Sequence, residues 1–176
     1  MTIRPVTKKD ISGLAQVHRA SWVQTYQTLI PDEILGNLSV FHFQSIWEKN
    51  LKNETHKHLL AEYNKQLIGF ISFSHSDVDT KISEISSMYL DHSKIGLGFG
   101  KSLIKWAFRE LKTLEFNKIV LWVVRENHHA IEFYKSLKFK PMNIERRIRR
   151  LGIELTQLQF SRSVNESTYR DRDAHR

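Results

Sequence analysis

The feature that most constrains this chain is a glycine-rich turn, Gly96-Leu97-Gly98-Phe99-Gly100, between an apolar strand pattern at residues 82–90 and a helix pattern at 98–114. Glycine lets the backbone approach a bound anion closely, and the N–H groups at a helix start point toward that anion while the helix dipole favours it. Lys101 adds a positive charge beside the turn. The arrangement indicates an anion site, although glycines also serve simply to make tight connections.

Two nucleotide-binding motifs carry glycines at similar spacing, and neither fits this turn. A Walker A loop requires Gly-x-x-x-x-Gly-Lys-Ser, whose last three residues match Gly100-Lys101-Ser102 but whose first glycine falls on Ile95. A dinucleotide fingerprint requires Gly-x-Gly-x-x-Gly, whose third glycine falls on Lys101. The turn also lies too far along the chain for the first strand of either fold. Both nucleotide interpretations are therefore disfavoured.

Hydrophobic periodicity divides the chain into strands and helices in an uneven order. Strands are expected at residues 2–6, 58–63, 66–75, 82–90, 118–124, 144–148 and 153–160. Helices are expected at residues 8–26, 39–51, 98–114 and 127–137, with Ser39 as an N-cap and a short helical turn after Pro31. The strand at 118–124 is apolar enough to be buried on both faces. This order predicts an α/β (α+β) fold with a mixed sheet rather than a doubly wound one.

Composition limits the class of protein. The 176 residues fit one domain, and a hydrophobic content of 40% is enough for a core. The chain has no cysteine, which excludes a disulfide scaffold, a thiolate zinc site and a cysteine nucleophile. No stretch approaches the roughly 18 consecutive apolar residues of a membrane-spanning helix, and the N-terminus lacks the apolar core of a signal peptide. A cytoplasmic protein without a membrane partner is the default expectation.

The formal net charge of +8 raises the question of an anionic partner. The basic residues are spread along the chain except for one dense cluster, Arg146-Arg147-Ile148-Arg149-Arg150, for which a solvated face or an exposed hairpin is the favoured interpretation. Aromatic and basic residues do not interleave as they do in sites that stack nucleic-acid bases. The sequence therefore argues against nucleic acid as the main partner.

The histidines show no metal-binding spacing. His128 and His129 are adjacent, so in a helix they cannot face one ion together. His18 and His42 add no pattern to them. No metal site is predicted.

The wider context of the turn resembles the GCN5-related N-acetyltransferase (GNAT) family. The signature of that family is Gln/Arg-x-x-Gly-x-Gly/Ala between a strand and the next helix, and residues 88–103 resemble it, with Gly98 and Gly100 at the two glycine positions. Gly96 stands where glycine is also common, whereas Ile95 replaces the usual Gln or Arg. That replacement removes a side chain but leaves the backbone donors in place.

Two further regions support the resemblance. Residues 121–139 resemble the later strand and helix of the family, with Lys138 in place of a usual glycine. The residues at the expected spacing there are Asn127, Ala130, Phe133, Tyr134 and Phe139. Residues 3–5, 21–26 and 29–32 resemble the N-terminal region of one common branch, so the resemblance spans about residues 2–160.

The resemblance implies a single-domain GNAT-like fold over residues 1–162, with a central mixed, mostly antiparallel sheet flanked by helices, and a polar C-terminal tail at 163–176. It implies acetyl-CoA as the co-substrate, with the pantetheine arm paired to the strand before the turn and the pyrophosphate held by the turn. The residues in this role are Met88, Tyr89, Leu90, Ile95, Gly96, Leu97, Gly98, Phe99, Gly100, Lys101 and Asn127. Asn127 also fits the role of a helix cap.

The resemblance further implies acetyl transfer to an amine, and the absence of cysteine favours direct attack in a ternary complex. Tyr134 takes the position of the acid that protonates the departing sulfur, or is an ordinary core residue. Glu84 takes the position of the base that deprotonates the amine, or is an outward-facing strand residue. Trp22 and Tyr26, one helical turn apart, either line the acceptor pocket or pack in the core.

Alternatives stay open at this point. The departures at Ile95 and Lys138 keep a non-catalytic acyl-CoA sensor on the same fold as the second hypothesis, and the net charge keeps a nucleic-acid-binding protein as the third. The acceptor is open among a small amine, an antibiotic, an amino acid, a polyamine and a protein N-terminus, because fold does not fix function. Family members often dimerise, so a homodimer is open as well.

Overall fold

One sheet of seven strands organises the computed structural model, which describes residues 1–75 and 81–165, and its strand order is β1-β2-β3-β4-β5-β7-β6. The strands are β1 (Thr2–Pro5), β2 (His56–Tyr63), β3 (Gln66–His75), β4 (Ile82–Leu90), β5 (Lys118–Val124), β6 (Lys140–Arg150) and β7 (Ile153–Ser163). Neighbouring strands are antiparallel except β4 and β5, which run parallel. The predicted mixed, mostly antiparallel sheet is confirmed.

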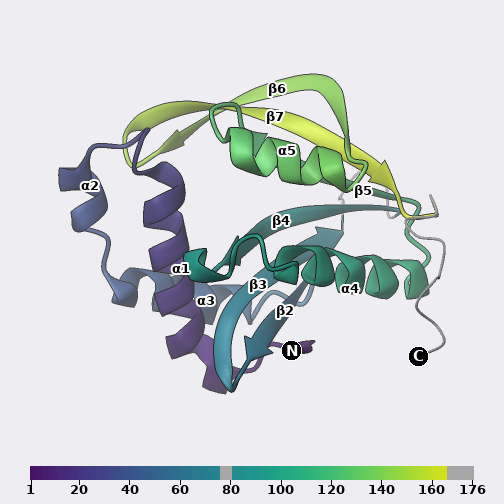
Figure 1. Ribbon diagram of the computed structural model, residues 1–176, viewed down its shortest axis with the longest axis horizontal. Coiled ribbons are helices and arrows are strands. Elements are labelled where there is room, and N and C mark those ends of the chain that lie inside the picture. Colours follow the sequence, from purple (N-terminus) through teal and green to yellow (C-terminus); the bar gives the residue numbers. More distant parts are fainter. Residues whose placement is uncertain (76–80, 166–176) are drawn as a thin grey trace.

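Helices cover both faces of this sheet (Figure 1). They are α1 (Ile11–Tyr26), α2 (Asp32–Gly36), α3 (Val40–Asn50), α4 (Phe99–Thr113) and α5 (His128–Ser136). One core cluster joins α4 and α5 to the sheet through residues such as Leu103 and Ile131. A second cluster joins α1, α2 and α3 to the other face through residues such as Leu14 and Trp47. None of the helices in the described residues is long and apolar enough to span a lipid bilayer.

The interior strand β5 shows how the two faces differ. Ile119, Leu121 and Val123 are buried in the cluster under α4 and α5. Successive strand residues point to opposite faces, so Val120 and Trp122 lie on the α1 side, where both are only partly buried. The expectation that this strand is buried on both faces is therefore wrong for its middle, because on the α1 side Val120 and Trp122 stay partly exposed and Trp122 is covered by the guanidinium of Arg146.

Element ends follow the predicted local signals with some shifts. Ser39 accepts a hydrogen bond from the N–H of His42 at 3.1 Å, as an N-cap does. β6 begins at Lys140, before the predicted start at 144, because this segment already pairs with β7. β7 runs on to Ser163, and Val164 is buried, so ordered packing continues past residue 162. Residues 166–176 of the predicted tail lie outside the described residues.

Candidate functional site

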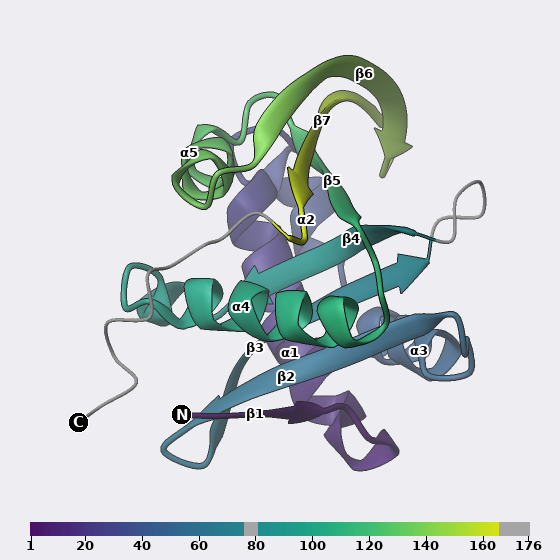
Figure 2. The same cartoon turned by 90° about the vertical axis from the view of Figure 1, so that its right-hand side faces the viewer.

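The sheet opens between β4 and β5. β4 stays paired with β3 as far as Leu90, but its parallel pairing with β5 ends at Ile85, opposite Leu121. β5 instead continues alongside β7 to Val124. Figure 2 shows β4 and β5 diverging from their shared end. Among the described residues, the last part of β4 therefore has a strand partner on one side only, and its other side is available to an extended ligand.

The register of β4 decides which backbone groups turn toward this opening. The N–H of Asp91 donates to the carbonyl of Ile68, beside β3, at 2.7 Å. Hydrogen-bonded positions alternate along an antiparallel ladder, so Tyr89 also directs its backbone groups to β3, whereas Met88 and Leu90 direct theirs to the opening. Of the three positions expected to pair with the pantetheine arm, Met88 and Leu90 have the suitable orientation.

The turn after β4 depends on glycine for its backbone conformation. Gly96 and Gly98 have φ angles of 83° and 84°, in the left-handed region that residues with a side chain rarely adopt. Gly98 is the N-cap of α4 and has no side chain to satisfy the N–H groups of the first helical turn. These N–H groups and the positive end of the helix dipole are directed out of the start of α4. An anion fits this position.

Gly100 has a different reason to be glycine. An added Cβ would lie 3.1 Å from Cδ1 of Leu90 and 3.2 Å from the ring of Phe133. Because these neighbours come from β4 and α5, a side chain at Gly100 would push the start of α4 away from the opening. The sequence motif identified the position but not this packing role.

The side chains of the turn contribute little charge. Ile95 is 40% exposed and Leu97 is 63% exposed, and both are apolar. Lys101 is exposed on the first turn of α4. An anion at this turn would therefore be held by backbone N–H groups and by Lys101 rather than by the side chain at Ile95.

Asn127 lies between β5 and α5. Its Oδ1 accepts a hydrogen bond from the N–H of Ala130 at 3.0 Å, so its predicted role as a helix cap is confirmed. The cap occupies the side-chain oxygen, and a contact of Asn127 with the cofactor stays a prediction.

Tyr134 projects from α5 into the core cluster shared with α4 and β5. It is 8% exposed, and its ring centroid lies 5.2 Å from that of Phe133 and 5.7 Å from that of Phe139. Burial raises the pKa of Tyr134, so the phenol keeps its proton at neutral pH. Tyr134 of α5 is also close enough to Tyr89 of β4 to act electrostatically on the pKa of that phenol. Tyr134 can therefore pack in the core and still carry a proton that it could donate.

Glu84 stands on β4 opposite Val120, immediately before β4 and β5 part. Its neighbours Ser83 and Ile85 are buried, and Ile85 belongs to the cluster under α4. By strand alternation Glu84 therefore faces the α1 side, where it is partly buried. Its carboxylate is near enough to Arg146 to act on the pKa of that guanidinium. An amine that enters from the α1 side would meet this carboxylate.

The aromatic residues of α1 are close to β4. The phenols of Tyr26 and Tyr89 lie close enough to act on each other, and burial raises the pKa of both. The ring of Trp22 lies 4.3 Å from that of Tyr26, centroid to centroid. Tyr26 is buried in the core cluster and Trp22 packs at the edge of it. Packing in the core is therefore confirmed for Tyr26, and a contact of either residue with an acceptor stays a prediction.

Two arginines near this site were not recognised as site residues from the sequence. Arg146 acts electrostatically with Glu84, and Arg150 acts on the phenols of Tyr26 and Tyr89. The period of two along a strand would have placed both arginines on one face of the cluster at 146–150. The alternation was not used as a site signal because a dense basic cluster is also typical of a solvated hairpin.

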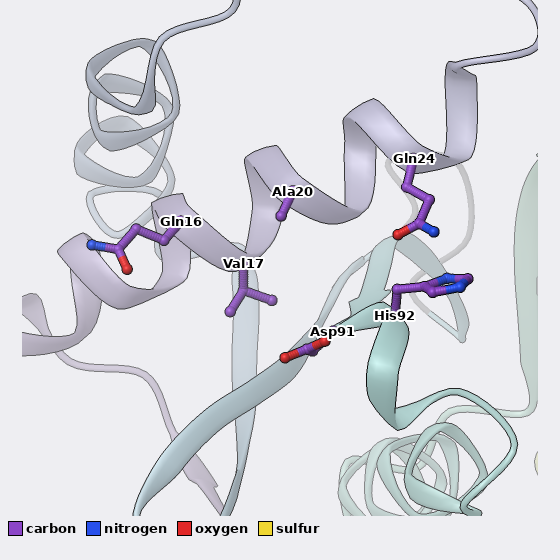
Figure 3. A pocket seen from close by; sticks show the side chains of 6 residues that line it. All are labelled: Gln16, Val17, Ala20, Gln24, Asp91 and His92. Carbon is purple, nitrogen blue, oxygen red and sulfur yellow. The ribbon is translucent and has the colours of Figure 1, made fainter.

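A hollow of about 300 Å³ lies between α1 and the start of the loop after β4 (Figure 3). It is lined by Gln16, Val17, Ala20, Gln24, Asp91 and His92. The Oδ1 of Asp91 accepts a hydrogen bond from the N–H of Ser93 at 2.9 Å, which shapes the start of that loop. The hollow borders the end of β4 and does not include Glu84 or Tyr134.

His58 is buried and His18 is half-buried, and both are packing residues. His18 lies against aromatic rings, with its centroid 4.7 Å from that of Phe43 and 5.0 Å from that of Phe70. Burial lowers the pKa of His18 to about 4. His58 is hydrogen-bonded to Ser72 through Nδ1 at 2.8 Å. Across residues 1–75 and 81–165, no three His, Asp or Glu side chains gather in an arrangement that could hold a metal ion.

Known proteins share this architecture. The structure of PaiA N-acetyltransferase from Thermoplasma acidophilum in complex with coenzyme A has a TM-score of 0.72 with this chain at 22% identity, covering 93% of this chain and 99% of that one. The uncharacterized N-acetyltransferase YuaI of Bacillus subtilis (strain 168) is 29% identical over 140 residues, which are 77% of this chain and 78% of the relative. The uncharacterized N-acetyltransferase MJ1207 of Methanocaldococcus jannaschii is 25% identical over 152 residues, which are 81% of this chain and 62% of the relative.

These similarities show that the chain has the fold of an N-acetyltransferase. In this structure β4 and β5 part after Ile85. Residues 15–139 match the acetyltransferase (GNAT) family. The chain belongs to this family, and it is an acetyltransferase. The family and the activity class expected from the sequence are both confirmed.

Proposed function

We propose that the protein transfers the acetyl group of acetyl-CoA to an amine by direct attack while both substrates are bound. The observation that carries the proposal is the parting of β4 and β5 after Ile85, with the uncapped start of α4 following β4 through the glycine turn. Acetyl-CoA supplies the activated thioester. With no cysteine in the chain, an acetyl-cysteine enzyme cannot form, which favours direct attack.

The residues around the opening fit the polar parts of acetyl-CoA. The backbone groups of Met88 and the N–H of Leu90 suit the amides of the pantetheine arm, which would lie along β4 as an added strand, while the Leu90 carbonyl accepts from Ser21. The first N–H groups of α4, together with Lys101, suit the pyrophosphate. The register of β4 against β3 shifts between Ile85 and Ser87, and an N–H freed at such a bulge suits the thioester oxygen. The coenzyme A complex of the T. acidophilum protein supports this assignment.

Glu84 has the role of general base for the amine. An alkylamine of pKa ~10 is mostly protonated at neutral pH and must lose a proton before it attacks. Glu84 lies where the two strands part and faces the α1 side, so it can take that proton directly or through one water molecule. The protonated amine would also be attracted to this carboxylate as it binds.

Tyr134 has the role of proton donor to the departing sulfur. Burial raises its pKa and keeps the phenol neutral, so a proton is always present. Transfer from this phenol to a thiolate whose acid has a pKa of ~8.5 is uphill, and a hydrogen bond from the phenol stabilises the thiolate before transfer is complete. Among the described residues the Tyr134 hydroxyl has no hydrogen-bond partner that would have to be displaced.

The test measures binding and turnover separately. Titration calorimetry with acetyl-CoA should show saturable binding with a dissociation constant of about 1 μM to 1 mM, the usual range for enzyme substrates. A panel of amines should then release free CoA thiol with at least one acceptor. Acetyl-CoA binding without thiol release on any amine would support the acyl-CoA sensor instead. Absence of binding would contradict both proposals.

A further inference from the structure

The arginine cluster at 146–150 is divided between two faces of β6. Ile148 packs into the core cluster that contains α1, so it marks the α1 side of the hairpin. Residues two apart on a strand share a face, so Arg146 and Arg150 lie on the α1 side while Arg147 and Arg149 lie on the other. Figure 1 shows the end of the β6–β7 hairpin reaching the side of the molecule that carries α1 and α2.

On the face away from α1, the arginines have partners within the hairpin. Arg147 forms an ion pair with Glu154 at 3.5 Å. The Nε of Arg149 donates to the carbonyl of Gly152 at 3.2 Å. Arg125 of the loop after β5 pairs with Glu145, which lies on this same face. The positive charge of this face is therefore largely balanced by nearby carboxylates and carbonyls.

On the α1 side, the positive charges of Arg146 and Arg150 are not balanced by ion pairs with described carboxylates. The guanidinium of Arg146 lies 4.2 Å from the ring centroid of Trp122, and its Nε donates to Oε1 of Gln157 at 2.8 Å. The stacking and the hydrogen bond fix the guanidinium plane and leave its terminal nitrogens without an ion pair in the described residues. Arg150 likewise forms no ion pair with any described carboxylate, and the like charges of Arg146 and Arg150 act on each other.

Both guanidinium groups face the acetyl-transfer site. Arg146 reaches from β6 across β7 to Trp122 of β5, toward the side where Glu84 stands, and acts electrostatically with Glu84. Arg150 acts on the phenols of Tyr26 and Tyr89. One carboxylate and two cations thus lie on the side of the sheet assigned to the acceptor amine.

We propose that the acceptor is a small amine that also carries a carboxylate or phosphate group, with the anionic group bound by Arg146 and Arg150 and the amine directed to Glu84. This inference rests on the proposed function. Guanidinium groups bind planar carboxylates and phosphates through paired N–H donors, and a bound anion relieves the repulsion between the two arginines. A polycationic amine would be repelled by the same two charges.

The apolar contacts of the hairpin favour a small acceptor. Ile148 and Ile153 pack into the same cluster as Leu29 and Ile34 of the α1–α2 region. All four side chains are partly buried, so the end of the β6–β7 hairpin lies beside the α1–α2 region and narrows this side of the site. A small acceptor fits such a narrowed site better than a bulky one does.

Acceptor pairs that differ only in one charge give a direct test. The probes are glycine against glycinamide and O-phosphoethanolamine against ethanolamine, with spermidine as the cationic probe. The proposal expects kcat/KM for the anionic member to exceed that of its neutral partner by about 10- to 100-fold in at least one pair. Glycine as the preferred probe identifies the group as a carboxylate, and O-phosphoethanolamine identifies it as a phosphate. Equal or higher kcat/KM for the neutral amines or spermidine overturns it.

Arginine variants separate this role from general effects. Arg146→Gln and Arg150→Gln should each remove most of the preference for the anionic member, while the KM for acetyl-CoA changes by less than about twofold. Arg147→Gln is the matched control on the opposite face, where loss of an exposed ion pair has little effect. Unchanged preference in both Arg146→Gln and Arg150→Gln overturns the proposal.

A binding measurement covers the case in which no probe is acetylated. Glutamate and O-phosphoethanolamine are titrated calorimetrically into the protein saturated with CoA. Heat that disappears in Arg146→Gln but persists in Arg147→Gln supports the anion site even if the transferase proposal fails. No heat with either anion, together with acetylation of a neutral amine, overturns the anion site and leaves the transferase proposal standing. No heat and no acetylation overturn it as well.

Discussion

The hydroxyl of Ser21 in α1 donates a hydrogen bond to the carbonyl of Leu90 at the end of β4, at 2.6 Å. Leu90 is also the residue that an added Cβ at Gly100 of α4 would approach to 3.1 Å. Leu90 is therefore in contact with α1 on one face of the sheet and with α4 on the other. These two contacts hold the end of β4 in place, where it is no longer paired with β5.

Replacement of Ser21 by alanine should destabilise the protein by about 1–3 kcal/mol, because Leu90 would keep a carbonyl without its hydrogen-bond donor. Urea unfolding followed by circular dichroism measures this change. Ser12→Ala is the control, since Ser12 is an exposed residue of the same helix. Equal midpoints for the two variants would show that the Ser21 hydrogen bond does not contribute.

Replacement of Gly98 by alanine should cost about 1–2 kcal/mol in stability, because its φ of 84° is unfavourable for a residue with a Cβ. No atom lies within 4 Å of the added Cβ, so the effect comes from the backbone alone. Acetyl-CoA affinity should fall as well, because the start of α4 shifts. Gly36→Ala, where the added Cβ also meets nothing and φ is not positive, is the control and should leave both quantities unchanged.

Replacement of Tyr134 by phenylalanine should lower kcat by about 10²-fold or more, the usual size of a general acid contribution. The KM for acetyl-CoA should stay the same, because the ring and its contacts with Phe133 and Phe139 are retained. Steady-state kinetics measures both constants. Tyr26→Phe, which removes another buried phenol hydroxyl near Tyr89, controls for loss of any buried hydroxyl near the site. Unchanged kcat in Tyr134→Phe would exclude the donor role.

Replacement of Glu84 by glutamine should lower kcat/KM for the amine by about 10²-fold near pH 7, where the amine needs a base. The defect should shrink as the pH rises toward ~10, because the amine then loses its proton to solvent. A pH series of kcat/KM for both proteins measures this recovery. A deficit that stays constant at every pH would assign Glu84 to packing or binding rather than to proton transfer.

Stability should fall as the pH drops from 6.5 toward 4, because His18 has a lowered pKa of about 4 in the folded state against an ordinary value of 6.5. In this window the unfolded chain binds a proton that the folded chain excludes, so acid favours unfolding. The loss from His18 is about 3 kcal/mol in total and stops below pH 4.

His18→Leu should remove this part of the acid dependence. Urea unfolding at pH 7 and pH 5 compares the variant with His92→Gln, since His92 is exposed. The pKa of His58 is also lowered by burial, so part of the slope should persist in the His18 variant. An identical slope in wild type and His18→Leu would show that His18 does not sense acid.

Local sequence signals predicted most of the elements and part of the site. The side chains of Ser39 and Asn127 accept the cap hydrogen bonds expected from their positions, and the hydrophobic periods located the helices and strands. Gly96 and Gly98 need glycine because of their own φ angles, which is a local property. The sequence could therefore indicate an anion-binding turn without any knowledge of the sheet.

Gly100 and Tyr134 are residues whose roles local sequence signals could not explain. The space at Gly100 is limited by Leu90 and Phe133, which come from two other elements. The pKa of Tyr134 is raised by burial in a cluster that brings α5 together with α4 and β5. A motif marks such positions, and only packing shows why a residue type is required.

The sequence by itself determined the order of elements, the glycine turn and the family, because these depend on residue types and spacings within short segments. Only the tertiary structure decided where β4 and β5 part, that Glu84 stands at this point, and that Arg146 and Arg150 face it from β6. The parting follows from pairing between β5 and β7, strands far apart in the chain. Such long-range pairing depends on the packing of the whole sheet, so no local pattern encodes it.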